Sequence, residues 1–469
     1  MSQNESNPQV SYDRPPVRRK RRKKTPWQKF KEAYLPLILV LVGLAVVVVL
    51  IIGLVKLVSR TPAPQKSNSS ESQTLPTEGE NQALLDQAAI LAAQYDYDGA
   101  LTLLGTCTNP DAQVEKAVTD YTAAKSALTV WPDVGKIPLI SFQPLIADTA
   151  RAFDGDDNAD YYARNSLTVS EFTAVLEQLY AGGYVLVSME DMAAPDNTGT
   201  YQPGQILLPE GKKPLILSYD DTNYYEYMLT NGFAYKLILD EDGKIASWGK
   251  DPQGNEVVSR DLDAIPMLDK FVEEHPDFSP FGAKACLSVT GYEGILGYRT
   301  QTDHTIQWTD EMEAYRQSEI EAVKPIIAEL KRTGWTFGSH TFGHIRLGTL
   351  SMEKIQSDTQ RWFDEVGSLV GPTNVLFYPH GERPDGDDWK TTGPVFQYLQ
   401  SQGFRILCSV GIESFSYIKK DICAVICDRL HPDGTTLRSK YVDQRYGQFY
   451  DVREIIDLDA RPDYGVNWQ

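Results

Sequence analysis

Short apolar runs alternate with longer amphipathic stretches from residue 137 onward. The runs have the length of β-strands and are residues 137–142, 184–188, 215–220, 284–289, 335–338, 375–378, 404–410 and 423–427. Apolar residues at helical spacing fall between them, most clearly over 170–181 and 312–332. This alternation of strands and helices predicts an α/β fold, a βα barrel, with functional residues at the C-terminal ends of the strands. Turns at Asp242-Gly243 and Gln253-Gly254 predict β-hairpins inside an insertion of about residues 226–283.

The N-terminal region has a different pattern. Ten Lys and Arg residues crowd positions 14–31, and residues 35–55 carry no charge. An uncharged stretch of this length spans a bilayer as a helix, and the basic cluster before it places the N-terminus in the cytoplasm. Because the span is too long for a cleaved signal core, we expect a signal anchor. The sequence thus predicts a cytoplasmic basic tail (1–34), a single transmembrane helix (35–58) and an extracytoplasmic remainder.

Two segments connect this span to the predicted barrel of residues 137–469. Residues 59–80 are rich in Ser, Pro, Gln and Glu and predict a flexible linker. Residues 81–131 carry apolar side chains three and four positions apart and are similar to one tetratricopeptide-type helical hairpin. One hairpin cannot form a solenoid, so we expect a spacer or cap, with binding of a protein partner as the alternative.

Charge and cysteine content limit the partners. The formal net charge is −19, and because the N-terminal tail is basic, the remainder is more acidic still. Such a domain repels polyanions, which excludes nucleic acid and favours a neutral or zwitterionic partner. The five cysteines are few and odd in number, so we expect buried thiols instead of a disulfide framework.

Two motifs carry candidate chemistry. Asp220 and Asp221 end the apolar run 215–220, and the stretch Ser-His-Thr-Phe-Gly-His, with His340 and His344, follows about a hundred residues later. Taken alone, the Asp-Asp pair also fits an ordinary strand-ending turn. Two histidines four residues apart can reach one ion, and an Asp-His-His set leaves a position for water. The conjunction predicts a metal-hydrolase site.

From residue 137 onward the chain resembles the polysaccharide deacetylase family, carbohydrate esterases that share the homology domain of nodulation chitooligosaccharide deacetylases. Leu-Ile-Leu-Ser-Tyr-Asp-Asp (215–221) is similar to its first motif, a strand ending in Thr-Phe-Asp-Asp-Gly, and His340 to His344 is similar to its His-Ser/Thr-x-x-His motif. The resemblance implies a distorted seven-stranded (β/α)7 barrel. It also implies that Asp220 is the general base and that Asp221, His340 and His344 bind a divalent metal, most commonly Zn²⁺.

The third motif departs from the family. Tyr378-Pro379-His380-Gly381 matches a known variant of the family's Arg-x-Pro-x-Gly, but Phe377 replaces the arginine that orients the base. We expect Arg299 or Arg383 to take over this role. Arg299 lies in a glycine-punctuated run, residues 290–300, which either passes close to another segment or forms a flexible surface turn.

The general acid of the family is a histidine in a late Leu-x-His motif. Here Leu430 directly precedes His431, one residue short of that spacing, so His431 and His380 are rival candidates for the acid. The substrate loop implied by the third motif contains Tyr378, Pro379 and Gly381, with Tyr292 added from the glycine-punctuated run. Asp387, Asp388 and Trp389 come too early for the fourth motif and receive no role.

The expected function is therefore removal of acetyl groups from an N- or O-acetylated glycan of the cell envelope, such as peptidoglycan, by amide or ester hydrolysis. Two alternatives follow from the missing arginine and the shifted histidine. One is a barrel that binds glycan with little or no turnover, and the other is an envelope scaffold that retains a hydrolase fold.

Overall fold

The computed structural model describes residues 78–386, 391–411, 413–439 and 445–468. The predicted basic tail and transmembrane span, and all but the last residues of the predicted linker, lie outside these ranges. Among the described helices, none combines the length and apolar character needed to cross a bilayer.

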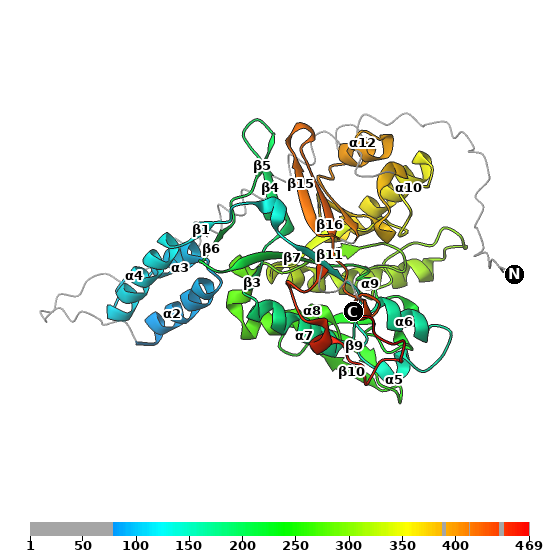
Figure 1. Ribbon diagram of the computed structural model, residues 1–469, viewed down its shortest axis with the longest axis horizontal. Coiled ribbons are helices and arrows are strands. Elements are labelled where there is room, and N and C mark those ends of the chain that lie inside the picture. Colours follow the sequence, from blue (N-terminus) through cyan, green and yellow to red (C-terminus); the bar gives the residue numbers. More distant parts are fainter. Residues whose placement is uncertain (1–77, 387–390, 412, 440–444, 469) are drawn as a thin grey trace, which may run out of the picture. The chain divides into compact units, whose positions relative to one another are not determined.

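Seven parallel strands form the centre of the described part of the chain (Figure 1). Their order is β2 (Leu139–Phe142), β7 (Lys213–Tyr219), β11 (Cys286–Val289), β12 (Thr336–Ser339), β13 (Val375–Phe377), β14 (Ile406–Val410) and β16 (Ala424–Arg429). The first and last strands also meet. Ser141 N donates to Leu430 O at 2.8 Å, and Leu430 N donates to Leu139 O at 3.0 Å. These bonds close the sheet and confirm the predicted distorted barrel.

Further strands extend the sheet or lie outside it. Strand β3 (Tyr184–Leu186) pairs in parallel with the first half of β7, and β15 (Phe415–Lys419), which the sequence analysis did not predict, pairs antiparallel with β16. Two short antiparallel pairs precede β7: β1 (Thr129–Val130) with β6 (Leu207–Leu208), and β4 (Ala193–Pro195) with β5 (Tyr201–Pro203).

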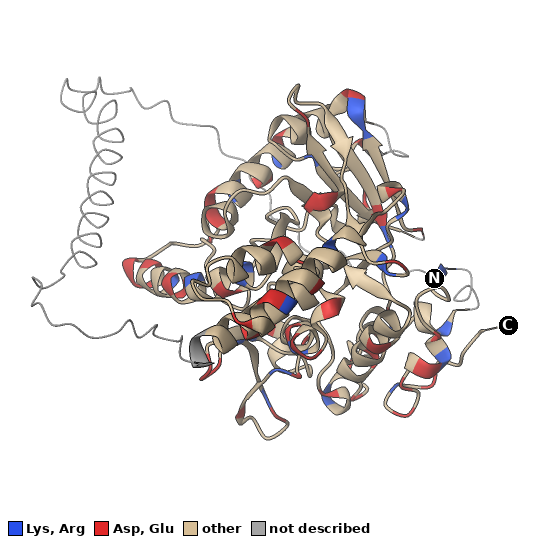
Figure 2. Cartoon of the chain, turned by 90° about the vertical axis from the view of Figure 1, so that its left-hand side faces the viewer, with Lys and Arg blue, Asp and Glu red and all other residues tan. Residues whose placement is uncertain are grey.

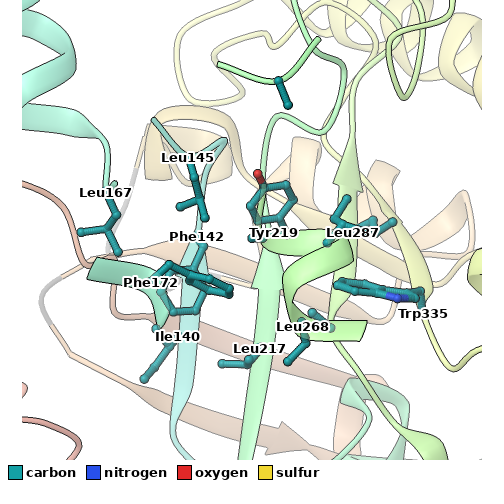
Figure 3. Close-up of a cluster of buried hydrophobic side chains, with 14 of the residues drawn as sticks. Ile140, Phe142, Leu145, Leu167, Phe172, Leu217, Tyr219, Leu268, Leu287 and Trp335 are labelled. Carbon is teal, nitrogen blue, oxygen red and sulfur yellow. The ribbon is translucent and has the colours of Figure 1, made fainter. Parts of the chain in front are cut away.

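Helices cover the outside of the strands. They are α5 (Thr149–Ala152), α6 (Ala159–Asn165), α7 (Val169–Ala181), α8 (Ala264–Glu274), α9 (Asp310–Arg332), α10 (Met352–Trp362), α11 (Ser368–Val370), α12 (Pro394–Ser401) and α14 (Val452–Ile455). Helix α7 begins with a capping box between Thr168 and Glu171, and its apolar face packs on the strands. Figure 3 shows this contact, where Phe172 meets Phe142 edge to face at 5.0 Å.

Alternate strand residues point into the barrel and fill it. The interior cluster includes Leu139, Ile216, Val375, Phe377 and Ile406, together with the buried thiols of Cys286, Cys408 and Cys427. All five cysteines lie in the described residues and are free thiols, as expected. Near the C-terminal ends of the strands the inward-facing side chains are small. Three are serines that are almost completely buried, Ser141, Ser218 and Ser288, and position 338 is glycine. This leaves interior space just below the strand ends.

The predicted insertion contains the expected hairpins. Strands β8 (Lys236–Leu239), β9 (Ile245–Lys250) and β10 (Glu256–Ser259) form an antiparallel sheet of their own. Its turns use Gly243 at φ 74° and Gly254 at φ 83°, the left-handed conformation that glycine adopts without strain.

The segment expected to form a helical hairpin holds three helices, α2 (Glu78–Ala93), α3 (Tyr97–Leu104) and α4 (Ala112–Ser126). Ala88, Ala100, Leu104 and Val114 form a small core among them. A hydrogen bond from Phe281 N to Gln94 O, 2.8 Å long, and the buried ring of Tyr95 attach this group to the barrel.

A buried ion pair anchors the C-terminal segment to the barrel wall. Arg461 donates to both carboxylate oxygens of Glu171 at 2.6 Å and to the carbonyls of Ala163 and Ser166, and neither charged side chain is exposed. Elsewhere, acidic and basic residues are interspersed over the elements (Figure 2), and several of their pairs are solvent-exposed.

We predict that Arg461→Met destabilises the fold by about 3–5 kcal/mol, because Glu171 would remain buried without a partner. Arg332→Met is the matched control, because this arginine, which pairs with Glu329, is 71% exposed and its loss should cost less than about 1 kcal/mol. Urea unfolding of both variants measures the difference. Equal effects would show that the buried pair does not anchor the C-terminal segment.

Candidate metal and catalytic site

The Asp-Asp pair lies where β7 ends, as the sequence predicts. Asp220 is buried, and its amide donates to Phe142 O of β2 at 2.8 Å. Asp221 follows with φ 55°, a left-handed conformation that is unusual outside glycine. This turn of the backbone takes Asp221 out of the strand direction, and both carboxylates line one cavity of about 210 Å³ at the C-terminal end of the barrel.

The two histidines lie on a tight loop after β12, not on a helix. His344 and the intervening Thr341 also have positive φ, 51° and 60°. Such residues cost about 1–3 kcal/mol each and persist only where surrounding contacts hold them. Here Asp358 of α10 accepts bonds from the amides of Phe342 and Gly343 at 2.7 and 2.8 Å, which fixes the loop.

The glycine-punctuated run packs against this loop. The amides of Gly291 and Tyr292 both donate to Phe342 O at 2.9 Å. A Cβ atom at position 291 would lie 2.2 Å from the Phe342 ring, so only glycine allows this approach. Of the two interpretations left open for residues 290–300, the close approach is therefore confirmed.

Asp221, His340 and His344 lie close enough together to hold one ion. One donor atom from each lies within 4.8 Å of the other two. His340 Nδ1 lies 3.1 Å from Phe377 O, so its N–H donates a hydrogen bond to this carbonyl. The other ring nitrogen, Nε2, is then the atom available to coordinate a metal ion. Burial lowers the pKa of His344, which keeps its imidazole neutral and able to coordinate. Two imidazoles and a carboxylate in this arrangement suit a divalent ion such as Zn²⁺.

Arg429 is the partner of Asp220. Its guanidinium is completely buried and donates to both carboxylate oxygens, at 2.7 and 2.9 Å. Its other hydrogen bonds go to Ser218 Oγ at 2.7 Å and Ser409 O at 3.1 Å. Burial alone would raise the pKa of Asp220, but Arg429 and the nearby His340 and His431 outweigh it and lower this pKa below its usual value. Asp220 is thus ionised at neutral pH, as a general base must be.

Phe377 supports the guanidinium of Arg429. The guanidinium carbon (Cζ) of Arg429 lies 4.4 Å from the centroid of the Phe377 ring, in a cation–π contact. The ring fits because position 338 of the neighbouring strand is glycine, where a Cβ atom would come within 2.5 Å of it. The small residues near the strand ends therefore accommodate one aromatic ring and one arginine.

The expectation that Arg299 or Arg383 orients the base is wrong. Arg299 donates to the carbonyls of Glu293 at 2.6 Å and Tyr224 at 3.0 Å and lies over the Tyr235 ring. It therefore ties the loop after β7 and the glycine-punctuated run to the insertion. Arg383 instead faces Asp428, at 4.0 Å.

Both candidate acids line the same cavity as the carboxylates. His431 Nδ1 is 3.2 Å from both Ser141 O and Ser141 Oγ, which orients the ring and leaves Nε2 unengaged by these contacts. His380 is exposed, has φ 58°, and its ring centroid lies 4.3 Å from that of His344. Although its side chain is exposed overall, partial desolvation at the cavity wall and the neighbouring His344 lower its pKa.

The expected substrate loop is only partly inside the cavity. Tyr378, His380 and Gly381 line it, whereas Pro379 is buried behind them. The amides of Tyr378 and Gly381 already donate within the fold, to Cys408 O and Tyr378 O. Tyr292 lies outside the lining, 53% exposed, with its ring 6.1 Å from that of Tyr225.

Arg429 is the site residue that sequence reasoning missed, although a signal was present. Strand alternation places Arg429 on the same face as Cys427, in the barrel interior. A charged residue that continues an apolar, inward-facing row must find a buried partner. Asp220, at the end of another strand, is a carboxylate to which the sequence motifs assign no such partner.

Comparisons with known proteins agree with this site. The family model "Polysaccharide deacetylase" matches residues 304–392, the segment that contains His340, His344 and the Tyr378–Gly381 loop. No curated protein matches the chain.

Solved structures with similarity include the Streptococcus pyogenes deacetylase PplD in complex with acetate. It has 14% identity, a TM-score of 0.37, and coverage of 64% of this chain and 93% of PplD. The putative polysaccharide deacetylase BA0330 from Bacillus anthracis has 11% identity and a TM-score of 0.35, with coverage of 69% and 68%. A polysaccharide deacetylase from Bacillus cereus, BC0361, has 11% identity and a TM-score of 0.34, with coverage of 65% of each chain. The match over residues 304–392 confirms the resemblance to the polysaccharide deacetylase family that the motifs indicate.

Proposed function

We propose that the protein is a metal-dependent hydrolase that removes acetyl groups from an N- or O-acetylated glycan of the cell envelope. One observation carries the proposal: an Asp-His-His ligand set and an ionised, arginine-paired carboxylate line a single cavity. A metal site beside a fixed base is the arrangement that hydrolysis of an amide or ester needs.

Each group has a distinct task in this reaction. A divalent ion bound by Asp221, His340 and His344 would supply Lewis-acid chemistry for the acetyl carbonyl and the attacking water. Asp220 accepts the proton of the water as its oxygen bonds to the carbonyl carbon, and Arg429 keeps this carboxylate ionised and aligned.

A histidine then returns a proton. When the C–N or C–O bond breaks, the leaving amine or hydroxyl of the sugar takes this proton and acetate is released. We assign the role to His431, because Ser141 holds its ring and it lies partly buried beside Asp220, whereas His380 is exposed.

The geometry argues against the alternative that the barrel binds glycan with little or no turnover. That alternative rested on the missing third-motif arginine, and Arg429 supplies an equivalent guanidinium to the base. Anchoring in the cell membrane through residues 35–58, with the barrel outside the cell, remains part of the proposal, as does a partner-binding role for the helices before the barrel.

We predict that His340→Ala abolishes stoichiometric metal binding, whereas Asp220→Asn retains the metal and lowers acetate release by at least about 100-fold, because it removes only the base. Metal analysis and acetate release from acetylated chitooligosaccharide measure the two effects on the full-length protein. Acetate release at the native rate by Asp220→Asn would contradict the assignment of the base.

Arg429→Gln and Arg429→Lys separate the charge of this residue from its geometry. In Arg429→Gln the positive charge is absent, so burial raises the pKa of Asp220. Asp220 then becomes protonated at a higher pH than in the native protein, and activity should be lost at that higher pH on acidification. Arg429→Lys keeps a positive charge but not the two parallel hydrogen bonds, and it should lower kcat by about 10- to 100-fold. The pH at which its activity is lost on acidification should change less than in Arg429→Gln.

The readout for this pair is the pH dependence of kcat/KM, with thermal unfolding to verify the fold. Arg299→Lys is the control and should leave the profile unchanged. If both Arg429 variants kept the native profile, the ion pair would have no part in positioning or ionising the base.

Replacing each candidate acid by glutamine distinguishes the two. We predict that His431→Gln lowers kcat by about 100-fold or more, because no other group here is fixed to protonate the leaving atom. His380→Gln should have a much smaller effect. A substrate whose leaving group needs no proton, such as an aryl acetate, should restore the rate of His431→Gln, and the opposite ranking of the variants would assign the acid to His380.

A further inference from the structure

Four tyrosine rings line one side of the catalytic cavity and form a continuous row. The row begins at the metal site, where Tyr225 donates its hydroxyl to Asp221 Oδ1 at 3.1 Å. The Tyr227 ring stacks on Tyr225 with centroids 6.0 Å apart, and on Tyr162 at 6.2 Å with an interplanar angle of 7°. Tyr161 completes the row, 6.0 Å from Tyr162.

The row leads out to solvent. The side chains of Tyr227 and Tyr161 are 46% and 61% exposed, and Tyr292, 53% exposed, lies beside Tyr225. Scattered exposed rings are common on protein surfaces, but contiguous ones that open from a catalytic cavity mark a binding surface.

Contacts behind the row hold it in place. Tyr162 is buried and meets Phe233 edge to face at 5.2 Å. Upstream of Tyr225, Asn223 accepts from Thr290 N at 3.2 Å and donates to the carbonyls of Thr290 and Gly294. The rings are therefore ordered before a ligand arrives, which lowers the entropy cost of binding.

Charge and ring chemistry define the occupant. Glu226, which is exposed, and Glu293 lie next to each other by the row, with Glu226 N donating to Glu293 Oε2 at 2.7 Å. Carboxylates at this position disfavour an anionic polymer. The flat faces of tyrosine suit the C–H faces of pyranose rings, and the phenol hydroxyl can bond to sugar hydroxyls.

We propose that this tyrosine row binds the sugar units that flank the reacting residue in a neutral or amino-sugar chain. The protein would thus select an extended glycan over a single sugar. The proposal builds on the proposed function, because it assigns the polymer part of the same substrate.

Binding without turnover tests the proposal on the full-length Asp220→Asn protein. The probes are N-acetylchitooligosaccharides of two to six units, and calorimetry gives Kd for each length. We expect affinity to rise by at least about tenfold from two to six units. Adding Tyr161→Ala and Tyr227→Ala should abolish this rise while the affinity for the dimer changes little.

Tyr417→Ala is the matched control. Its ring is 54% exposed, but it lies at the opposite end of the barrel, in a cavity lined by Pro138 and Pro214. This variant should keep the full dependence on length, and circular dichroism verifies the fold of all variants.

Three results would overturn the proposal: no binding at any length, equal affinity at all lengths, or a length dependence that survives the double substitution. Acetate release by the native protein reports separately on the proposed function. Length-dependent binding without acetate release would support glycan binding by the tyrosine row and contradict the proposed hydrolase function. Acetate release with equal affinity for all lengths would support the hydrolase function and contradict glycan binding by the row.

Discussion

The buried ion pair between Asp220 and Arg429 is the interaction on which the site depends. Transfer of two charges into the barrel interior is costly, and the attraction between them compensates only if the geometry is good and the remaining donors are satisfied. Here the guanidinium meets both carboxylate oxygens, and Ser218 and Ser409 accept its further bonds. The small residues at the upper level of the interior provide the space for this arrangement.

The barrel allows the partner of Asp220 to come from a distant strand. Inward-facing positions of different strands surround one volume, so a guanidinium can reach the same carboxylate from more than one strand. In this chain Arg429 comes from β16, while β13 contributes Phe377 as the surface on which it rests. Gly338 and Phe377 together shape the space, and a larger residue at 338 would displace the ring. Position 377 thus supports the guanidinium and does not supply it.

The strands and the cluster of Asp221, His340 and His344 could be predicted because their signals are local. Apolar runs located each barrel strand to within a few residues, and the spacing of Asp220, Asp221, His340 and His344 indicated one site. The position of Arg429 is not a local signal, since it depends on the pairing of β16 with β2 and on the volume left by Ser141, Ser218 and Gly338. Likewise, the third helix before the barrel and strand β15 have weak periodicity, and tertiary packing specifies them.

Closure of the barrel has a consequence for the order of events during folding. Residues 429–431 act in succession: Arg429 reaches the base, Leu430 bonds to β2, and His431 enters the cavity. Leu430 is separated from Leu139 by most of the barrel sequence, and contacts of such long range form late because their loop must close first. During synthesis, a chain that ends before β16 already contains Asp221, His340 and His344 but lacks the arginine that pairs with Asp220. The cluster of Asp220, its guanidinium and His431 therefore becomes complete only with the last strand of the barrel.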